Sequence, residues 1–163
     1  MFGRLSEEIE VKVPASEAWK VYGTLKLADI ASESLPGLLS KIDIIKGQGG
    51  VGTIIHLFFT PGTPGVTSYK EKYVVVDDEK RVKVAEVVEG GYLDMGFKSY
   101  QVQFEVIDKD NGCCITRATI EYEVEDEANA AALVSIQPLL AIMKVAANYL
   151  LQNYNNNNTT TSS

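Results

Sequence analysis

The chain has few residues of the kinds on which several classes of function depend. Its 163 residues include one histidine, two cysteines and no cluster of basic residues, and its formal net charge is −7. A nucleic-acid-binding protein normally carries a basic patch, so we expect no nucleic-acid partner. No apolar run approaches the roughly 18 residues that cross a bilayer, and the N-terminus lacks the apolar segment of a secretory signal. We therefore expect no membrane association and a cytoplasmic location.

The cysteines and the histidine do not suggest a disulfide or a metal site. Cys113 and Cys114 are adjacent in a predicted strand, where neighbouring side chains point to opposite faces and cannot easily bridge each other. So few cysteines are typical of a reducing compartment. His56 has no second ligand at metal spacing, so we expect it to be an ordinary strand side chain with a local hydrogen bond.

The chain does contain a clear succession of periodic segments. Residues 5–13 alternate apolar and polar side chains, which predicts a half-buried strand. Pro14 signals the start of a short helix, Gly23 separates it from a second one, and Pro36 ends the second. Six more strands are expected at residues 38–46, 53–60, 66–76, 81–88, 96–108 and 114–124.

After residue 127 the apolar spacing changes to three and four residues, which predicts one long amphipathic helix. Pro138 lies inside this segment and should kink or loosen it. Residues 154–163, rich in Asn, Thr and Ser, are expected to be a disordered tail behind a single domain at 1–153. Strands followed by a helix indicate an α+β fold. We expect a curved seven-stranded antiparallel sheet that grips the long helix, with two short helices closing an apolar cavity.

The segment KGQGGVGT, from Lys46 to Thr53, matches the G-x-G-x-x-G spelling of a dinucleotide-binding loop. That motif requires a helix after the glycines, whereas TIIHLFFT is β-branched and aromatic and predicts a strand. No lysine follows Gly52, so the loop is not a P-loop either. We interpret the glycines as a connection between strands that needs positive φ angles and close packing.

Glu71 and Lys83, on neighbouring predicted strands, are candidates for acid–base chemistry. The register of the hairpin between these strands decides whether the two side chains face each other. If Asp78-Glu79 form a two-residue loop, Glu71 shares its face with Glu86 and Lys83 points to solvent. Apolarity alone mildly favours this register, with Val82, Val84 and Val88 facing inward. If the loop also includes Asp77, Lys83 lies opposite Tyr73 and diagonal to Glu71. An amine and a carboxylate facing one apolar cavity would shift each other's pKa and could perform acid–base chemistry.

The segments GQGGVGT, SYKEKYVVVDDEKRVK and VVEGGYLDMGF resemble the plant Bet v I family, also called pathogenesis-related class-ten proteins, and more narrowly its (S)-norcoclaurine synthase branch. The resemblance covers nearly the whole chain. It implies a Pictet–Spengler C–N lyase that joins an arylethylamine such as dopamine to an aldehyde such as 4-hydroxyphenylacetaldehyde. It also implies that no metal or organic cofactor takes part, and a monomer or weak dimer is expected.

The resemblance also assigns roles to three residues. The family's tyrosine at the cavity entrance falls on Tyr69, and its glutamate, which removes the ring proton, falls on Glu71. Its lysine, which acts in carbinolamine dehydration and holds the phenol, falls on Lys83. These roles favour the three-residue loop. We expect substrate to contact Tyr73, Tyr100, Val102, Leu140 and Met143, the last two as core or cavity wall, and we place the rings of Tyr92 and Tyr122 in the wall.

One residue departs from the pattern of the family. Val102 stands where the family has an inward aspartate, so the site has one polar group fewer. Condensation that stops at an imine, or a different ring closure, therefore stays open. A second class of function also stays open, namely a non-catalytic carrier of hydrophobic plant metabolites or hormones. Retention of Tyr69, Glu71 and Lys83 favours the enzyme, and Val102 favours the carrier.

Overall fold

A computed structural model describes residues 1–161 of the chain, and the side chains of residues 1–156. Seven strands form one antiparallel sheet, as predicted, and their order in the sheet is β1-β7-β6-β5-β4-β3-β2. Consecutive strands from β2 to β7 are neighbours, and β1 joins the sheet beside β7. The strands are β1 (Phe2–Val11), β2 (Leu39–Lys46), β3 (Ile54–Phe59), β4 (Ser68–Asp77), β5 (Val82–Gly90), β6 (Phe97–Lys109) and β7 (Cys113–Val124).

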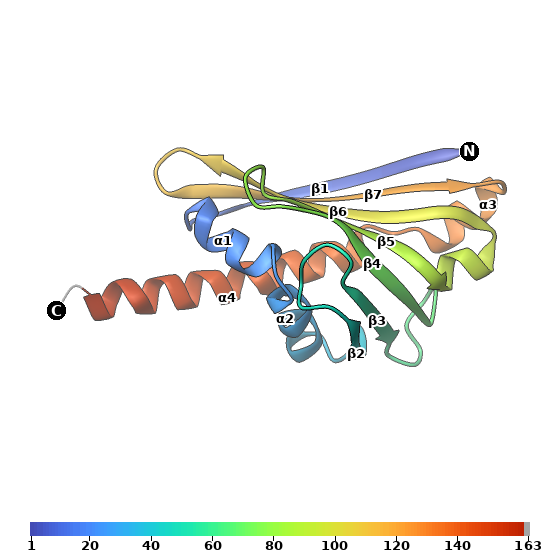
Figure 1. Ribbon diagram of the computed structural model, residues 1–163, viewed down its shortest axis with the longest axis horizontal. Helices are drawn as coiled ribbons and strands as arrows, with labels where there is room; N and C mark the ends of the chain where they lie inside the picture. The colour runs from blue at the N-terminus through green and yellow to red at the C-terminus, as the bar shows by residue number, and fades with distance from the viewer. Residues whose placement is uncertain (162–163) are drawn as a thin grey trace.

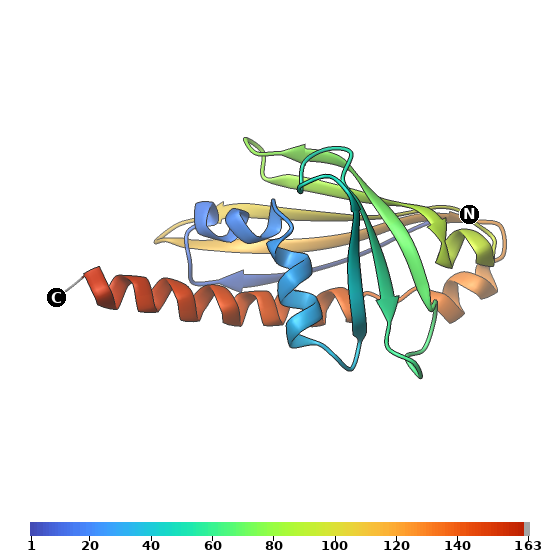
Figure 2. The ribbon, with the colours of Figure 1, turned by 60° about the horizontal axis from the view of Figure 1, so that its bottom comes forward.

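The helices lie on one side of this curved sheet. The long helix α4 (Gln137–Thr161) runs along the molecule below β6 and β7, as Figures 1 and 2 show. The short helices α1 (Ala15–Tyr22) and α2 (Lys26–Ser34) lie near the middle of α4. The 3₁₀ helix η1 (Gly91–Met95) and helix α3 (Glu127–Leu133) lie away from α1 and α2, at the end of the sheet near the N-terminus. This arrangement is the predicted helix-grip fold.

The structure corrects the prediction of one continuous C-terminal helix. Helix α3 begins directly after its N-cap residue Asp126. The side chain of Asp126 accepts a hydrogen bond from the backbone N–H of Ala128 at 2.9 Å. The chain then becomes extended at Val134, and α4 starts at Gln137. Pro138 therefore occupies the first turn of a new helix, where its missing N–H costs no hydrogen bond, instead of kinking a continuous one.

The structure also has a helix over residues 154–161, where we predicted a disordered tail. Tyr154 is half-buried against the core and anchors the helix at this point. Once a helix is nucleated, each further residue adds a hydrogen bond at little cost, so a polar segment can extend it. Ser162 and Ser163, which also belong to the predicted tail, lie outside the described residues.

The C-terminal helical segment Glu127–Asn156 has a mean hydropathy of 1.8, and by length and composition alone it could cross a membrane. Core helices of water-soluble folds pass the same test. Here Met143, Ala146 and Leu150 are buried among the residues of the core. The absence of a membrane partner stays a prediction.

The glycine-rich segment connects β2 to β3 and is followed by a strand, as predicted. Gly47 and Gly49 have φ angles of 91° and 109°, a region that favours glycine. A Cβ at Gly47 would also lie 2.8 Å from the Cα of Thr53. The glycines therefore allow positive φ angles and a close approach of the loop backbone to Thr53.

Cys113, Cys114 and His56 are strand residues. Both cysteines are free thiols, Cys114 buried and Cys113 half-buried. Burial raises the pKa of the Cys114 thiol to about 11. The ring of His56 stacks on Phe58 with centroids 4.0 Å apart. Among the described residues, no group of three or more His, Cys, Asp or Glu side chains could hold a metal ion.

Candidate active site

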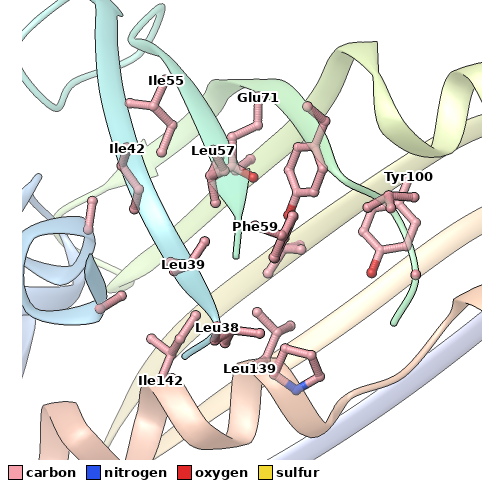
Figure 3. A pocket seen from close by; sticks show the side chains of 18 of the residues that line it. Leu38, Leu39, Ile42, Ile55, Leu57, Phe59, Glu71, Tyr100, Leu139 and Ile142 are labelled. Carbon is pink, nitrogen blue, oxygen red and sulfur yellow. The ribbon is translucent and has the colours of Figure 1, made fainter. Parts of the chain in front are cut away.

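A cavity of about 120 Å³ lies between the central strands and helices α2 and α4. Figure 3 shows its apolar part, in which Leu39 and Ile42 of β2 lie across from Leu139 and Ile142 of α4. Its polar lining groups include the side chains of Tyr69, Glu71, Tyr73, Lys83, Tyr92 and Tyr100. An apolar chamber with a few converging polar groups is the usual form of a small-molecule site.

A β-bulge brings the amine and the carboxylate to the same face of the sheet. The β4–β5 hairpin closes with Asp77 opposite Val82, so its loop is longer than either register that we considered. Near this loop Lys83 pairs with Val76, which by simple alternation would face away from Tyr73. The pairing shifts between Tyr73 and Val75, and this bulge reverses the alternation of β4.

The predicted face of Lys83 is therefore correct, but the predicted register is wrong. Ala85, and not Lys83, lies opposite Tyr73, and Lys83 reaches the cavity from the next inward position of β5. The preference for Val82, Val84 and Val88 as the inward set, drawn from apolarity alone, is also wrong, since Val88 is exposed. A bulge has no strong sequence signal, so periodicity could not locate it.

Lys83 is held in a nearly dry environment. Its side chain is buried, with 2% of the residue exposed, and its Nζ donates a hydrogen bond of 3.4 Å to the carbonyl oxygen of Thr24. The Nζ also lies over the ring of Tyr73, 4.6 Å from the centroid, and 5.8 Å from that of Phe104. Burial lowers the pKa of Lys83 to about 8, and the negative charge of Glu71 partly opposes this shift.

Glu71 faces the same cavity from β4. Burial raises the pKa of its carboxyl group to about 7, and the charge of Lys83 opposes the shift. The part of Glu71 that stays accessible borders the cavity. None of the ion pairs found among the described residues joins Glu71 to Lys83. Each group is thus poised near neutral pH and free to act on a bound molecule.

Three tyrosines surround the carboxylate side of the cavity. The rings of Tyr92 and Tyr100 stack with centroids 3.7 Å apart, and Tyr69 packs against Tyr92 at 5.8 Å. Burial raises the pKa of Tyr69 above its ordinary value, and the charge of Glu71 adds to the effect. The pKa of Tyr100 is likewise raised by burial. These phenols stay protonated at neutral pH and can donate hydrogen bonds to an oxygen atom in the cavity.

Three of the other residues predicted to contact substrate lie in the lining of the cavity. Tyr73, Tyr100 and Val102 line the cavity as expected. Val102 is buried on β6 between Ala85 and Ile120, so the wall at this point is apolar.

The two residues expected from the long helix as core or cavity wall do not line the cavity, and their contact with substrate stays a prediction. Met143 is completely buried in the core, and Leu140 does not line the cavity. Leu139 and Ile142 line the cavity instead. The helix is interrupted between α3 and α4, and this interruption changes which residues of α4 face the cavity. The three- and four-residue spacing of the sequence could not reveal that break.

Two further expectations concern tyrosines of the wall. Tyr92 lies in the cavity lining, as expected. Tyr122 does not, because its ring lies over Gly3, where a Cβ would collide with it, and packs against Phe97. Sequence reasoning also missed Phe59, whose ring packs against Tyr69 at 5.6 Å in the cavity lining.

The arrangement can transfer protons in both directions inside one apolar chamber. A lysine with a pKa of about 8 can donate a proton to a departing hydroxyl group, and a carboxylate with a pKa of about 7 can accept one from carbon. The phenols can orient oxygen substituents of a bound ring. These are the requirements of an amine–aldehyde condensation.

The sequence of the chain is similar to that of a known protein family. The family model of the pathogenesis-related protein Bet v 1 family matches residues 1–153. Norbelladine synthase from Narcissus pseudonarcissus is 41% identical over 157 residues, which cover 96% of this chain and 96% of that protein. S-norcoclaurine synthase 2 from Papaver somniferum is 36% identical over 148 residues, which cover 89% of this chain but 64% of the poppy protein.

The fold is also similar to solved structures of a synthase. A point mutant of Thalictrum flavum norcoclaurine synthase, in complex with a transition-state analogue, superposes with a TM-score of 0.86 at 34% identity. This match covers 94% of this chain and 97% of the synthase. The structure of that synthase with dopamine and hydroxybenzaldehyde has a TM-score of 0.83 at 34% identity and covers 93% and 88% of the two chains.

Proposed function

Because the chain belongs to the pathogenesis-related protein Bet v 1 family, we propose that its cavity condenses an arylethylamine with an aryl-substituted aldehyde without a cofactor. The chain is a norcoclaurine synthase-like enzyme of that family. The observation that carries the proposal is the placement of Glu71 and Lys83 around one cavity, each with a pKa near neutrality and without a mutual ion pair.

The first half of the reaction uses Lys83 as an acid. The amine nitrogen adds to the aldehyde carbon and forms a carbinolamine. The Lys83 ammonium then protonates its hydroxyl group, water leaves, and the nitrogen lone pair completes an iminium ion. The apolar walls around Lys83 make its proton easier to release than that of an exposed lysine, because burial disfavours the charged form.

The second half uses Glu71 as a base. The electron-rich ring of the amine attacks the iminium carbon, and a carbon–carbon bond forms. Glu71 removes the proton from the attacked ring carbon, so the aromatic ring is restored and a tetrahydroisoquinoline results. A carboxyl group with a pKa of about 7 accepts a carbon-bound proton more readily than an exposed one and still ionises at neutral pH. We propose dopamine and 4-hydroxyphenylacetaldehyde as the first pair to test.

The apolar wall at Val102 supports a second candidate outcome. With no carboxylate at this position, the chamber offers a cationic intermediate one stabilising group fewer, and condensation that stops at the imine is compatible with the site. A carrier of hydrophobic metabolites would use the same walls without any proton transfer. The first test must therefore separate ring closure, imine formation and binding.

The test is a turnover assay with dopamine and 4-hydroxyphenylacetaldehyde, analysed on a chiral column with and without a hydride trap that reduces any imine. The protein variants are Lys83→Met and Glu71→Gln. Lys72→Met and Glu86→Gln are matched controls, because these residues lie on the same two strands, occupy opposite positions in the β4–β5 register and do not line the cavity. A buffer blank measures the uncatalysed racemic reaction.

We expect an enantiomeric excess that disappears in Lys83→Met and Glu71→Gln and persists in both controls. The loss of turnover should reach about a hundredfold or more, the usual contribution of a general acid or base. A trapped secondary amine above the blank, with no cyclised excess, would assign the chain to imine formation. Racemic product at the blank rate in every sample, with no trapped amine, would reject catalysis on this pair and favour the carrier.

A further inference from the structure

The glycine-rich loop, residues 47–53, connects the two groups that hold the ammonium of Lys83. One of these groups is the carbonyl oxygen of Thr24, in the turn between α1 and α2. The other is the ring of Tyr73 on β4. The turn and the strand are distant in sequence, so their spacing must be set by whatever packs between them.

One end of the loop is bonded to the backbone of Tyr73. The N–H of Gly52 donates to the carbonyl oxygen of Tyr73 at 2.8 Å, and the N–H of Tyr73 donates to the carbonyl oxygen of Thr53 at 2.8 Å. The side chain of Thr53 is buried, with 1% of the residue exposed. This end of the loop therefore fixes the strand position from which the Tyr73 ring covers Lys83.

The other end of the loop packs against the turn. A Cβ at Gly49 would lie 3.3 Å from the backbone nitrogen of Leu25 and 3.7 Å from the Cα of Thr24. The buried N–H of Gly49 donates to Oγ1 of Thr53 at 2.9 Å, which ties this contact to the end that holds Tyr73. The loop is thus a continuous link from the Tyr73 backbone to the backbone of Thr24.

We propose that Gly49 and Thr53 are positioning residues for Lys83, because together they hold the Thr24 carbonyl and the Tyr73 ring at the distances that enclose its ammonium. The catalytic meaning of this inference rests on the proposed function, whereas the structural link does not. Gly49 is favoured because an added Cβ would lie 3.3 Å from the backbone nitrogen of Leu25, so that the turn would have to shift, and because its φ of 109° suits glycine. Thr53 is required because its hydroxyl group receives the Gly49 N–H.

Opening this enclosure has one main electrostatic consequence. Water that enters beside Thr24 relieves the desolvation of Lys83, so the pKa of its ammonium rises from about 8 towards 10.5. Glu71 on β4 is the charged group that acts on Lys83 from the facing strand, and it is unchanged in the variants described next. Tyr73, whose own pKa is raised by burial, stays protonated throughout.

The test measures the titration of Lys83 directly, from the ¹³Cε signals of lysine-labelled protein followed over pH. The Lys83 signal is the one that is missing from Lys83→Met. The variants are Gly49→Ala, which inserts the Cβ, and Thr53→Val, which removes the hydroxyl group at equal size. Thr53→Ser keeps the hydroxyl group. Gly62→Ala is the control for backbone strain, because Gly62 has a φ of 90° and open space around an added Cβ.

We expect the Lys83 midpoint to rise by about one pH unit in Gly49→Ala and Thr53→Val, with the other lysines unmoved. Thr53→Ser and Gly62→Ala should match the wild type. For an active pair of substrates, kcat should fall about tenfold with KM nearly constant, since misplacement affects the transition state more than binding.

An unmoved Lys83 midpoint in folded Gly49→Ala, or in Thr53→Val where Gly49→Ala does not fold, would overturn the inference. A rise of equal size in Gly62→Ala would also overturn it, since strain anywhere would then be sufficient. The midpoint needs no turnover. A protein that shows the expected midpoints but condenses no amine with an aldehyde would refute the proposed function and leave the positioning role intact.

Discussion

The space between the sheet and α4 has two halves that differ in how completely it is filled. In the filled half, Met143, Ala146 and Leu150 are buried, and α4 contacts β1 and β7 directly. In the hollow half, Leu139 and Ile142 of the same helix border the cavity beneath the central strands. The same helix therefore provides a packed core along one face and a chamber wall along another.

The two halves also differ in the charged side chains on the inner face of the sheet. In the filled half, Arg117 points outward and pairs with Glu8 at 3.0 Å. In the hollow half, Glu71 and Lys83 point inward. A filled core leaves no room for a hydrated charge, whereas a chamber tolerates one at the cost of a shifted pKa. Incomplete packing is thus the condition for chemistry here.

The sharpest way to break this comparison is to place the same carboxylate in each half. Val106→Asp buries it in β6 at a core position outside the cavity, and Val102→Asp places it in the cavity wall. We expect Val106→Asp to lower the free energy of unfolding by more than about 4 kcal/mol and Val102→Asp by about 1 to 2 kcal/mol, because only the second carboxylate can reach water. Urea denaturation at pH 7 measures both. Equal losses would show that the chamber is as dry as the core.

A second prediction shortens two neighbouring side chains of α4. Met143→Ala opens a void in the filled half and should cost about 3 kcal/mol of unfolding free energy. Ile142→Ala enlarges an existing cavity and should cost about 1 kcal/mol or less, since fewer packing contacts are lost. Denaturation at one pH gives both values, and the two positions serve as controls for each other. A larger loss for Ile142→Ala would reverse the assignment of the halves.

The third prediction concerns the pH dependence of stability. The folded-state pKa of Glu71 is raised to about 7, so its neutral form stabilises the fold fully below the unfolded value of 4.5. This contribution is lost as the pH rises through 7. Glu71→Gln lacks the loss, so relative to the wild type it should gain about 2 kcal/mol in unfolding free energy between pH 5 and pH 8. Glu86→Gln is the matched control, because this residue lies on the neighbouring strand and does not line the cavity. A constant difference between Glu71→Gln and the wild type would mean that Glu71 titrates normally.

The sequence predicted the strands and short helices well. It predicted less well which side chains of these elements face the cavity. Alternation placed all seven strands, and Pro14, Gly23 and Pro36 placed the two short helices, because these signals act within a few residues. The strand predicted after the glycine-rich loop is present as β3, and the absence of a bound nucleotide stays a prediction. The resemblance to the family supplied Tyr69, Glu71 and Lys83, which the structure brings to one cavity.

The bulge between Tyr73 and Val75 and the break before α4 were beyond sequence reasoning. Each shifts the alternation of a strand or the period of a helix by one or a few residues. The placement of Leu140 outside the cavity lining follows from the break before α4, whereas Tyr122 lies outside it because its ring packs over Gly3.

The amino-acid sequence by itself determined the order of the elements, the α+β class and the set of titratable residues, since these follow from local periodicity and side-chain chemistry. Tertiary structure alone decided that Lys83 and Glu71 face the same chamber, which residues of α4 form its wall, and how far the two pKa values move. Burial and the distance between charges set those quantities, and both exist only once strands far apart in sequence have paired and α4 has closed beneath them.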